Sequence, residues 1–266
     1  MKISNNGISL SEINSLIDSN CVIVGNNAIH DNLPAFLKYI HFVVSSDNIR
    51  SSKIRSAIDF LKKNNIFIIY SSKLIRYLNK RLNLHRRNIN FFLFIDPKLR
   101  NIVSLNDFIQ DSIKLRHSTI VAFPSLDYEY NIGSMIRTAY AFGVDAILIP
   151  KNFKNFYSPA VTKISTGYNY QIKLIQDKFI DSLRRLKEIG FSLYCFDSLG
   201  GENISKVVYN PKACFVFGTE AKGVEKYIMS ECDCTIAIPM QNGVESLSVS
   251  VSLGIALYDR KYKENI

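Results

Sequence analysis

The sequence predicts an α/β protein with a parallel sheet in its C-terminal part and a smaller, basic α/β domain ahead of it. Apolar segments of strand length alternate with segments of helical periodicity from about residue 117 onward. Strands that are separated by helices indicate a parallel sheet. Shorter elements alternate in the first part of the chain, and most of the positive charge lies between residues 50 and 100. We therefore expect two domains, at residues 1–105 and 106–266.

The N-terminal domain is expected to contain short helices and strands. Apolar residues recur at helical spacing over residues 52–65 and 72–83, and apolar runs of strand length cover residues 66–70 and 91–95. This alternation predicts a compact α/β unit.

The C-terminal domain is expected to hold a longer alternation. Strands are predicted at residues 118–123, 146–150, 170–175, 191–196, 213–217 and 234–239. Helices are predicted from Asn131, at residues 158–165, 177–189 and 224–230, and from Glu245 to about Lys263. A sheet of this kind binds its ligands at the carboxyl ends of its strands. Functional residues are therefore expected where these strands end.

Charge is distributed unevenly along the chain. The formal net charge is +10, and residues 50 to 100 hold 13 lysines and arginines against Asp59 and Asp96, a net charge of +11. The remaining 20 basic and 21 acidic residues nearly cancel. This concentration favours an acidic partner for the N-terminal domain.

Nucleic acid is the partner that we expect. Lys53, Arg55, Arg86 and Arg87 lie among helical patterns with few acidic neighbours and with aromatic residues nearby. Such a patch binds phosphates without reading sequence. The alternative is that these side chains only solvate helix faces.

The sequence lacks the features that are typical of several other classes of protein. The longest apolar run, residues 246–258, is short and broken by serines, and the first residues do not resemble a secretory leader, so we expect a soluble, cytoplasmic protein. Five cysteines without a C-x-x-C pair indicate neither a disulfide framework nor a zinc site, and no metal is expected. The glycine patterns of dinucleotide-binding and P-loop proteins are absent. An unrelated α/β oxidoreductase is therefore disfavoured.

Three polar, glycine-containing stretches follow predicted strands. They read NIGSMIRTA from residue 131, FVFGTEAKGV from residue 215 and IPMQNGVESL from residue 238. Gly218 and Gly223 permit a backbone to approach a flat ligand closely. Taken singly, each stretch could be an ordinary turn, and Ser246 could be a helix N-cap.

Taken together, the three stretches resemble the motifs of the SpoU branch of the knotted RNA methyltransferases, which transfer a methyl group from S-adenosylmethionine to a ribose 2′-hydroxyl. The first motif is matched by Asn131, Gly133, Arg137, Thr138, Ala139 and Gly143. The second is matched by Phe217, Gly218, Glu220 and Gly223. The third is matched by Ile238, Pro239, Met240, Ser246, Leu247, Val249, Ser250 and Val251. The resemblance covers residues 117–263.

The resemblance implies a deep trefoil knot in the C-terminal domain, a homodimer, and S-adenosylmethionine as cofactor. The sequence is most similar to the thiostrepton and nosiheptide resistance branch, in which a ribosomal-protein-like α/β domain precedes the methyltransferase domain and large-subunit ribosomal RNA is modified. A role in antibiotic resistance and a housekeeping role both remain open, and so does a transfer RNA substrate.

The family pattern also implies roles for individual residues. Arg137 would hold the phosphate or ribose of the target nucleotide, because a guanidinium is too basic to act readily as a general base. Asn131 would orient Arg137 or the ribose, and Glu220 and Ser246 would shape the site beside the methyl group. The cofactor slot would be formed by Phe196, Gly218, Thr219, Glu220, Ile238, Pro239, Met240 and Leu247.

Two residues depart from the family pattern. Ser248 stands where the third motif usually has asparagine, and Thr166 stands where the resistance branch tends to have arginine. Lys163 is the candidate to replace the lost contact to phosphate or carboxylate, and we include it among the RNA-binding residues. Ser248 leaves a second hypothesis open, a knotted RNA-binding protein with weakened or lost catalysis.

Overall fold

The structure is a computed structural model and describes residues 8–84, 89–126, 128–197, 200–219, 223–242 and 244–264. By packing, the chain divides into two units. Unit 1 contains residues 1–100 and 155–171, and unit 2 contains residues 101–154 and 172–266.

The described part of unit 1 forms a four-stranded mixed sheet in the order β1-β4-β2-β3. Its strands are β1 (Val22–Val24), β2 (Ile40–Ser45), β3 (Ile68–Tyr70) and β4 (Phe91–Ile95). β4 runs antiparallel to β1 and β2, and β3 runs parallel to β2. The helices of unit 1 are α1 (Leu10–Asp18), α2 (Asn26–His30), α3 (Leu33–Phe36), α4 (Ser52–Lys63), α5 (Ser72–Arg81) and α8 (Pro159–Ile164).

Helices cover both faces of this sheet. α1 and α5 bury apolar side chains against one face, where Phe42 and Phe94 stack with ring centroids 4.6 Å apart. α4 buries Ile54, Ile58 and Leu61, which recur at helical spacing. The hydroxyls of Ser51 and Ser71 cap α4 and α5 by accepting from backbone amides in the first turn. The helices predicted at residues 52–65 and 72–83 thus begin where expected.

Unit 2 contains, within its described residues, an eight-stranded sheet in the order β10-β12-β9-β11-β6-β7-β8-β5. Its strands are β5 (Ile102–Val103), β6 (Ser118–Ala122), β7 (Ala146–Pro150), β8 (Lys173–Asp177), β9 (Ser192–Phe196), β10 (Glu202–Asn203), β11 (Lys212–Phe217) and β12 (Cys234–Ala237). The pairings that link these strands are parallel. The predicted parallel α/β fold is confirmed.

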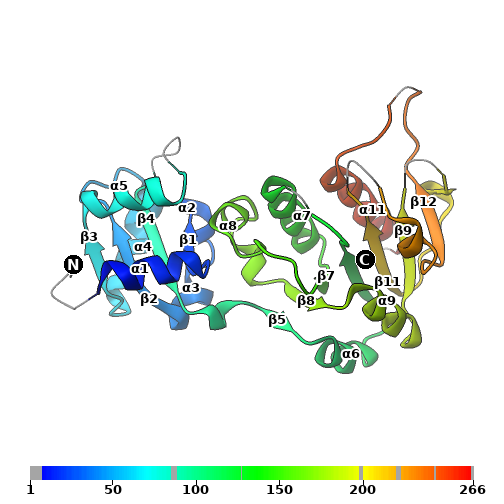
Figure 1. Cartoon of the computed structure of the whole chain (residues 1–266), viewed down its shortest axis with the longest axis horizontal. Coiled ribbons are helices and arrows are strands. Elements are labelled where there is room, and N and C mark those ends of the chain that lie inside the picture. The colour runs from blue at the N-terminus through cyan, green and yellow to red at the C-terminus, as the bar shows by residue number, and fades with distance from the viewer. Residues whose placement is uncertain are drawn as a thin grey trace. The chain divides into compact units, whose positions relative to one another are not determined.

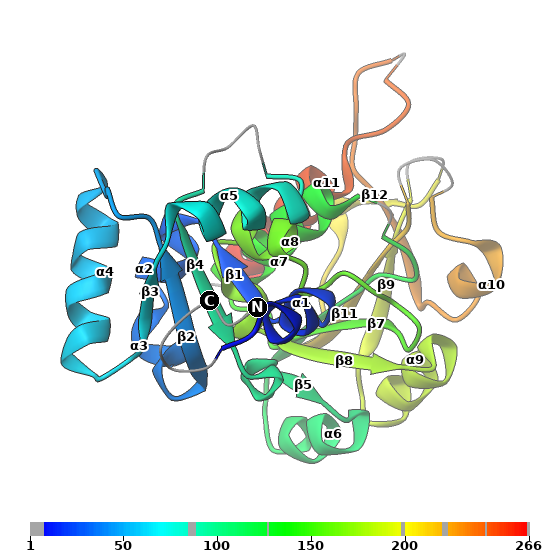
Figure 2. The same cartoon turned by 60° about the vertical axis from the view of Figure 1, so that its left-hand side comes forward.

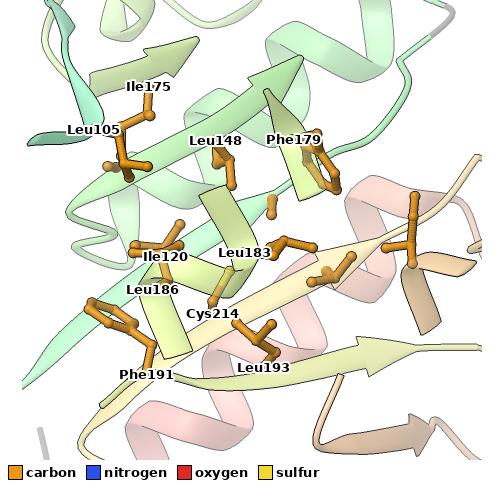
Figure 3. Close-up of a cluster of buried hydrophobic side chains, with 14 of the residues drawn as sticks. Leu105, Ile120, Leu148, Ile175, Phe179, Leu183, Leu186, Phe191, Leu193 and Cys214 are labelled. Atoms are coloured by element: carbon orange, nitrogen blue, oxygen red, sulfur yellow. The ribbon is translucent and has the colours of Figure 1, made fainter. Parts of the chain in front are cut away.

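Helices again lie on both faces. The helices of unit 2 are α6 (Leu105–Ile113), α7 (Glu129–Ala141), α9 (Phe179–Glu188), α10 (Lys226–Met229) and α11 (Val249–Glu264). Side chains of α6, α9 and α10 join the strands in one core, and Figure 3 shows Leu183 and Leu186 of α9 among the strand residues of that cluster. α7 and α11 pack side by side, as Figures 1 and 2 both show. The pocket described below lies at the end of this layered core.

Several element boundaries differ from the prediction, among them those of α11, α7 and β8. α11 begins at Val249, so the expectation that Glu245 and Ser246 open the last helix is wrong. The carbonyl of Ser248 accepts from the amide of Ser252 at 3.0 Å, which makes Ser248 the residue at the helix entry. α7 begins at Glu129, two residues before Asn131.

The third difference concerns β8, which was expected from Tyr170. Residues 168–170 form a 3₁₀ turn instead, and the strand begins at Lys173. The amide of Leu174 donates to the carbonyl of Asn101 at 2.8 Å, beside the pairing of β8 with β5. Tertiary pairing therefore sets the strand boundary.

Candidate active site

A pocket opens where β9, β11 and β12 end. Parallel strands bring their carboxyl ends to one edge of a sheet, so segments far apart in the sequence meet there. The described lining residues are Phe196, Asp197, Phe217, Gly218, Thr219, Gly223, Ile236, Ile238, Met240, Ser246, Leu247, Val249 and Ser252. The cavity between them has a volume of about 100 Å³ and opens to solvent at its mouth.

Aromatic rings support the inner wall of this pocket. Phe196 ends β9 and Phe217 ends β11, and their rings stack with centroids 4.5 Å apart and an interplanar angle of 10°. Phe123, just after β6, lies 6.1 Å from the Phe217 ring. All three side chains are buried. The wall is therefore rigid and apolar, and polar contacts must come from the strand-end loops.

A tight loop follows β11. Thr219 and Gly223 exchange two backbone hydrogen bonds, of 3.1 and 2.9 Å. A Cβ atom on Gly218 would overlap the carbonyl group of Gly223, and Gly223 has φ of +62°. Both positions therefore need glycine, which explains why this motif contains two. Glu220, expected in the site, lies outside the described residues.

Asp197 is a pocket residue that the sequence analysis missed. It follows β9 directly, and its amide donates to the carbonyl of Ile236 at 3.1 Å. Its carboxylate faces Gly223, since a Cβ there would lie 3.1 Å from Oδ2. Among the described lining residues it is the ionisable one. The signal in the sequence that could have identified Asp197 is its position directly after an apolar strand.

The segment between β12 and α11 forms the remaining wall. Ile238, Met240, Ser246 and Leu247 line the pocket, whereas Pro239 is exposed and does not. Figures 1 and 2 show this segment, drawn in orange, projecting from the body of unit 2. The predicted cofactor residues of the second and third motifs are thus brought together, with Pro239 and Glu220 as the exceptions noted.

The first motif lies on α7 and does not line the pocket. Asn131 is half-buried, and Arg137 is exposed on the helix surface. Arg137 makes no hydrogen bond or ion pair with another residue that the structure describes. Its guanidinium is therefore available to an external anion.

The thiols near the site are poor nucleophiles. A contact with the Cys232 thiol, together with burial, raises the pKa of Cys195, and burial raises the pKa of Cys214. Only the thiolate is a strong nucleophile. Within the described ranges, no three His, Cys, Asp or Glu side chains are grouped to hold a metal ion.

Unit 1 contains a second cavity, lined mainly by polar groups. It lies among the start of α2, the β2–α4 loop, the start of β4 and α8. The described lining residues are Gly25, Asn26, Asn27, Ala28, Asn48, Ile49, Arg50, Ser51, Ile54, Ile89, Asn90, Phe91, Lys163 and Thr166. We call it the asparagine groove. Of the expected RNA-binding residues, Lys163 lines it.

Two other expected RNA-binding residues, Lys53 and Arg55, lie at the start of α4. Lys53 donates to Oδ1 of Asn27 at 2.9 Å, and Arg55 donates to the carbonyl of Arg50 at 3.3 Å. Both side chains are exposed at the first turns of α4. Arg86 and Arg87 lie outside the described residues.

Comparison with known protein families matches residues 118–258, more than half of the chain, to the model of the SpoU rRNA methylase family. The chain belongs to this family. Within the SpoU match lie β6, β9, β11 and β12 and every described residue of the pocket. The family predicted from the three motifs is confirmed.

Curated SpoU relatives are distant in sequence. An uncharacterised tRNA/rRNA methyltransferase of Mycoplasma genitalium is 29% identical over 82% of this chain and 89% of its own length. The 23S rRNA (guanosine-2′-O-)-methyltransferase of Nitrosomonas europaea is 28% identical over 61% of this chain and 62% of its own. A putative tRNA/rRNA methyltransferase of Staphylococcus epidermidis is 30% identical over 59% of this chain and 64% of its own. The chain thus spans less than two thirds of the last two relatives.

Solved structures share the fold across nearly the whole chain. A structure described as an RNA 2′-O ribose methyltransferase has a TM-score of 0.77 at 19% identity and covers 96% of both chains. The SpoU methyltransferase AviRb from Streptomyces viridochromogenes, crystallised with AdoMet, has a TM-score of 0.72 at 15% identity and covers 94% of this chain and 98% of its own. At these identities the likeness establishes the fold. None of the helices within the described ranges is long and apolar enough to cross a membrane.

Proposed function

We propose that this protein is an S-adenosylmethionine-dependent RNA 2′-O-ribose methyltransferase that acts on large-subunit ribosomal RNA. One observation carries the proposal: the second and third SpoU motifs meet around a single pocket at the carboxyl edge of a parallel sheet. The name of the Nitrosomonas relative, a 23S rRNA methyltransferase, supports the ribosomal substrate. A transfer RNA substrate is the alternative within the same chemistry.

The pocket fits the proposed cofactor. Gly218 and Gly223 let the backbone after β11 close onto the strand end, because a Cβ on Gly218 would overlap the Gly223 carbonyl. Ile238, Met240 and Leu247 supply apolar contacts beside this strand end. Asp197 offers a carboxylate that accepts from ribose hydroxyls and lowers the energy of a nearby cation. Bound S-adenosylmethionine would supply an activated methyl group on a sulfonium centre.

The protein then has to position the acceptor. Arg137, exposed on α7, would bind the phosphate or ribose of the target nucleotide, and Asn131, six residues earlier on the same helix, would orient that contact. A guanidinium stays protonated, so Arg137 is a positioning group and does not accept the hydroxyl proton. Correct placement of two reactants supplies several kcal/mol of a barrier, about 7 to 11 in the best cases. Glu220 and Ser246 complete the site in this proposal.

A homodimer accounts for the separation between Arg137 and the pocket. Arg137 does not line the pocket of its own chain, so a second copy is proposed to complete the site. Tyr258 and Tyr262 lie exposed on the last turns of α11, with rings 6.2 Å apart, and Tyr140 is exposed at the end of α7. Exposed aromatic groups of this kind are typical of interfaces. The knot implied by the family remains part of the same proposal.

The N-terminal domain, residues 1–105, is proposed to hold the RNA. Lys53 and Arg55 are exposed beside the asparagine groove, and Arg50 and Lys163 line it. Cationic groups bind phosphates, and asparagine amides both donate to and accept from base edges. Arg86 and Arg87 belong to the same proposal.

Transfer of labelled methyl from S-adenosylmethionine to separately fractionated, unmodified ribosomal and transfer RNA tests the function. We expect label at a 2′-hydroxyl of large-subunit RNA. Label on transfer RNA alone would show that the substrate is transfer RNA and not ribosomal RNA. Cofactor binding without methyl transfer to any RNA would favour the alternative, an RNA-binding protein that has lost catalysis.

Arg137→Ala tests the positioning role. We expect methyl transfer to fall below detection while calorimetry shows S-adenosylmethionine binding unchanged, because Arg137 lies outside the cofactor pocket. Lys178→Ala is the control, since Lys178 is exposed on unit 2 beside α9. Equal loss of cofactor binding and transfer would contradict the role.

A further inference from the structure

Two aromatic side chains stand exposed at the start of α7. Tyr128 precedes the helix and is 67% exposed, and Tyr130 in the first turn is 70% exposed. Neither makes a hydrogen bond or ring contact with another described residue. Large aromatic groups usually cover apolar surface when a chain folds. Neither tyrosine lines the pocket, so the proposed cofactor site does not explain why they are exposed.

These tyrosines lie at the same edge of the sheet as the pocket. β6 runs parallel to β11, so α7 starts at the carboxyl edge, where β9, β11 and β12 also end. The connection passes through Phe123, whose ring lies 6.1 Å from that of Phe217 in the pocket wall. In the proposed homodimer Arg137 completes the pocket of the second copy, so Tyr130 would lie near the acceptor of that pocket.

Tyr130 shares a helix face with Arg137. Seven residues separate them, which is close to two full turns, or about 10 Å along the axis. The buried residues of α7 occupy the other faces: Ile132, Gly133, Met135, Ile136 and Ala139. One exposed stripe thus presents an aromatic ring at one end and a guanidinium at the other.

The two ends of this exposed stripe differ in charge. Glu129 lies half-buried beside Tyr130 in the first turn and disfavours a phosphate there. Arg137, two turns on, favours one. An uncharged, flat group is therefore suited to the tyrosine end and an anion to the arginine end. A nucleotide carries both.

We propose that Tyr130 stacks on a base of the RNA substrate while Arg137 binds a phosphate or ribose of the same strand. This inference rests on the proposed function and adds a residue that positions the substrate through its base. Unpaired RNA bases are commonly held by stacking on aromatic side chains. An aromatic ring can stack on any of the four bases. Tyr130 would therefore contribute affinity and position the RNA, and other residues would recognise the identity of the base. Tyr128 flanks the platform.

The competing occupant of this surface is a second copy of the chain. Tyr140, Tyr258 and Tyr262 lie at the opposite ends of α7 and α11, toward the amino edge of the sheet. That separation leaves the first turn of α7 to the RNA. Sedimentation analysis of Tyr130→Ala distinguishes the two: an unchanged oligomeric state is expected, and loss of the oligomer would overturn the inference.

Fluorescence gives a direct test, because the chain contains no tryptophan. In Tyr130→Trp the introduced indole is the sole one, and we expect its emission to fall when in-vitro-transcribed 23S ribosomal RNA is added. Val208→Trp is the control, since Val208 is 89% exposed and precedes β11 at the amino edge of the sheet. Equal emission changes in both variants, or none in Tyr130→Trp, would overturn the inference.

Affinity and rate give an independent test. For Tyr130→Ala we expect the Kd and KM for the RNA to rise roughly 5- to 150-fold, the range for loss of one stacked base. Tyr130→Phe keeps the ring and should stay near the wild-type values, while S-adenosylmethionine binding is unchanged in both. If the wild-type chain methylates RNA and Tyr130→Ala does so equally well, the inference fails and the function stands. If the wild-type chain neither binds nor methylates RNA, both fail.

Discussion

Gly218 shows how a single residue shapes the pocket. A side chain there would occupy the position of the Gly223 carbonyl, and the loop between them is closed by two backbone hydrogen bonds. Backbone atoms held in this way cannot move aside at low cost, because the sheet fixes one end of the loop.

Gly218→Ala is therefore expected to lower the free energy of unfolding by about 1 to 3 kcal/mol, the usual cost of overpacking, and to abolish S-adenosylmethionine binding. Thermal unfolding and calorimetry measure the two effects. Gly200→Ala is the control, because a Cβ at Gly200 meets nothing within 4 Å. Normal cofactor binding by Gly218→Ala would contradict our account of the loop.

Ser248 replaces an asparagine of the family motif at the entry of α11. Its carbonyl accepts from the amide of Ser252, and its hydroxyl lies 3.3 Å from that of Ser250. Serine and asparagine are both favoured at helix N-caps. The replacement therefore keeps the local structure and changes the polar groups offered to the site.

For Ser248→Asn we expect a free energy of unfolding within about 0.5 kcal/mol of the parent chain, since the two residues cap equally well. An increase in methyl-transfer rate would assign the asparagine a direct role with the acceptor. Chemical denaturation and single-turnover kinetics provide the measurements. A large loss of stability would show that the serine has a structural role that the helix entry does not explain.

At the scale of elements, α11 connects the pocket to the rest of unit 2. Its first turn contributes Val249 and Ser252 to the pocket, and its middle packs against α7, where Thr138 would lie 3.8 Å from a Cβ on Gly254. Near its end, Arg260 is only 4% exposed and donates to the carbonyls of Asn210 and Pro211 at 3.1 and 2.8 Å. The helix is thus fixed at both ends.

Arg260→Ala is expected to destabilise the fold by about 1.5 to 3 kcal/mol, because two hydrogen bonds from a buried, charged donor are lost. Lys261→Ala, at the exposed neighbouring residue, should stay within about 0.5 kcal/mol. Denaturant unfolding compares the two. Similar small effects would mean that water replaces the guanidinium.

At the scale of the whole chain, positive charge is concentrated in the N-terminal part. Residues 50 to 100 carry a net charge of +11, and the rest is nearly neutral. Affinity for RNA that comes from phosphate contacts falls steeply with salt, because bound counterions are released. The salt dependence of RNA binding should therefore arise from the N-terminal domain.

Lys53→Glu is expected to weaken RNA binding and to reduce the slope of log K against log salt by about 1. Lys178→Glu reverses a charge on unit 2 instead and should leave the slope unchanged. Filter binding over a series of salt concentrations measures both. Equal slopes for the two variants would remove the case for an RNA-binding N-terminal domain.

The segment 155–171 shows what the linear sequence leaves open at this scale. It follows β7 in the chain but packs within unit 1, where buried Asn32 donates to the carbonyls of Ala28 and Thr166 at 2.9 and 2.8 Å. Gly167, with φ of +87°, lies against the same asparagine. Hydrogen bonds between residues 134 positions apart leave no local pattern to detect.

The sequence by itself determined the alternation of strands and helices, the concentration of charge and the three motifs. These features are local, because periodicity, turn residues and motif spacing depend on neighbouring positions. Only the tertiary structure decided that Asp197 joins the pocket, that α11 begins at Val249 and that Arg137 lies outside the pocket of its own chain. Each of these depends on which strand ends and helices become neighbours, and that is set by long-range packing rather than by the residues on either side.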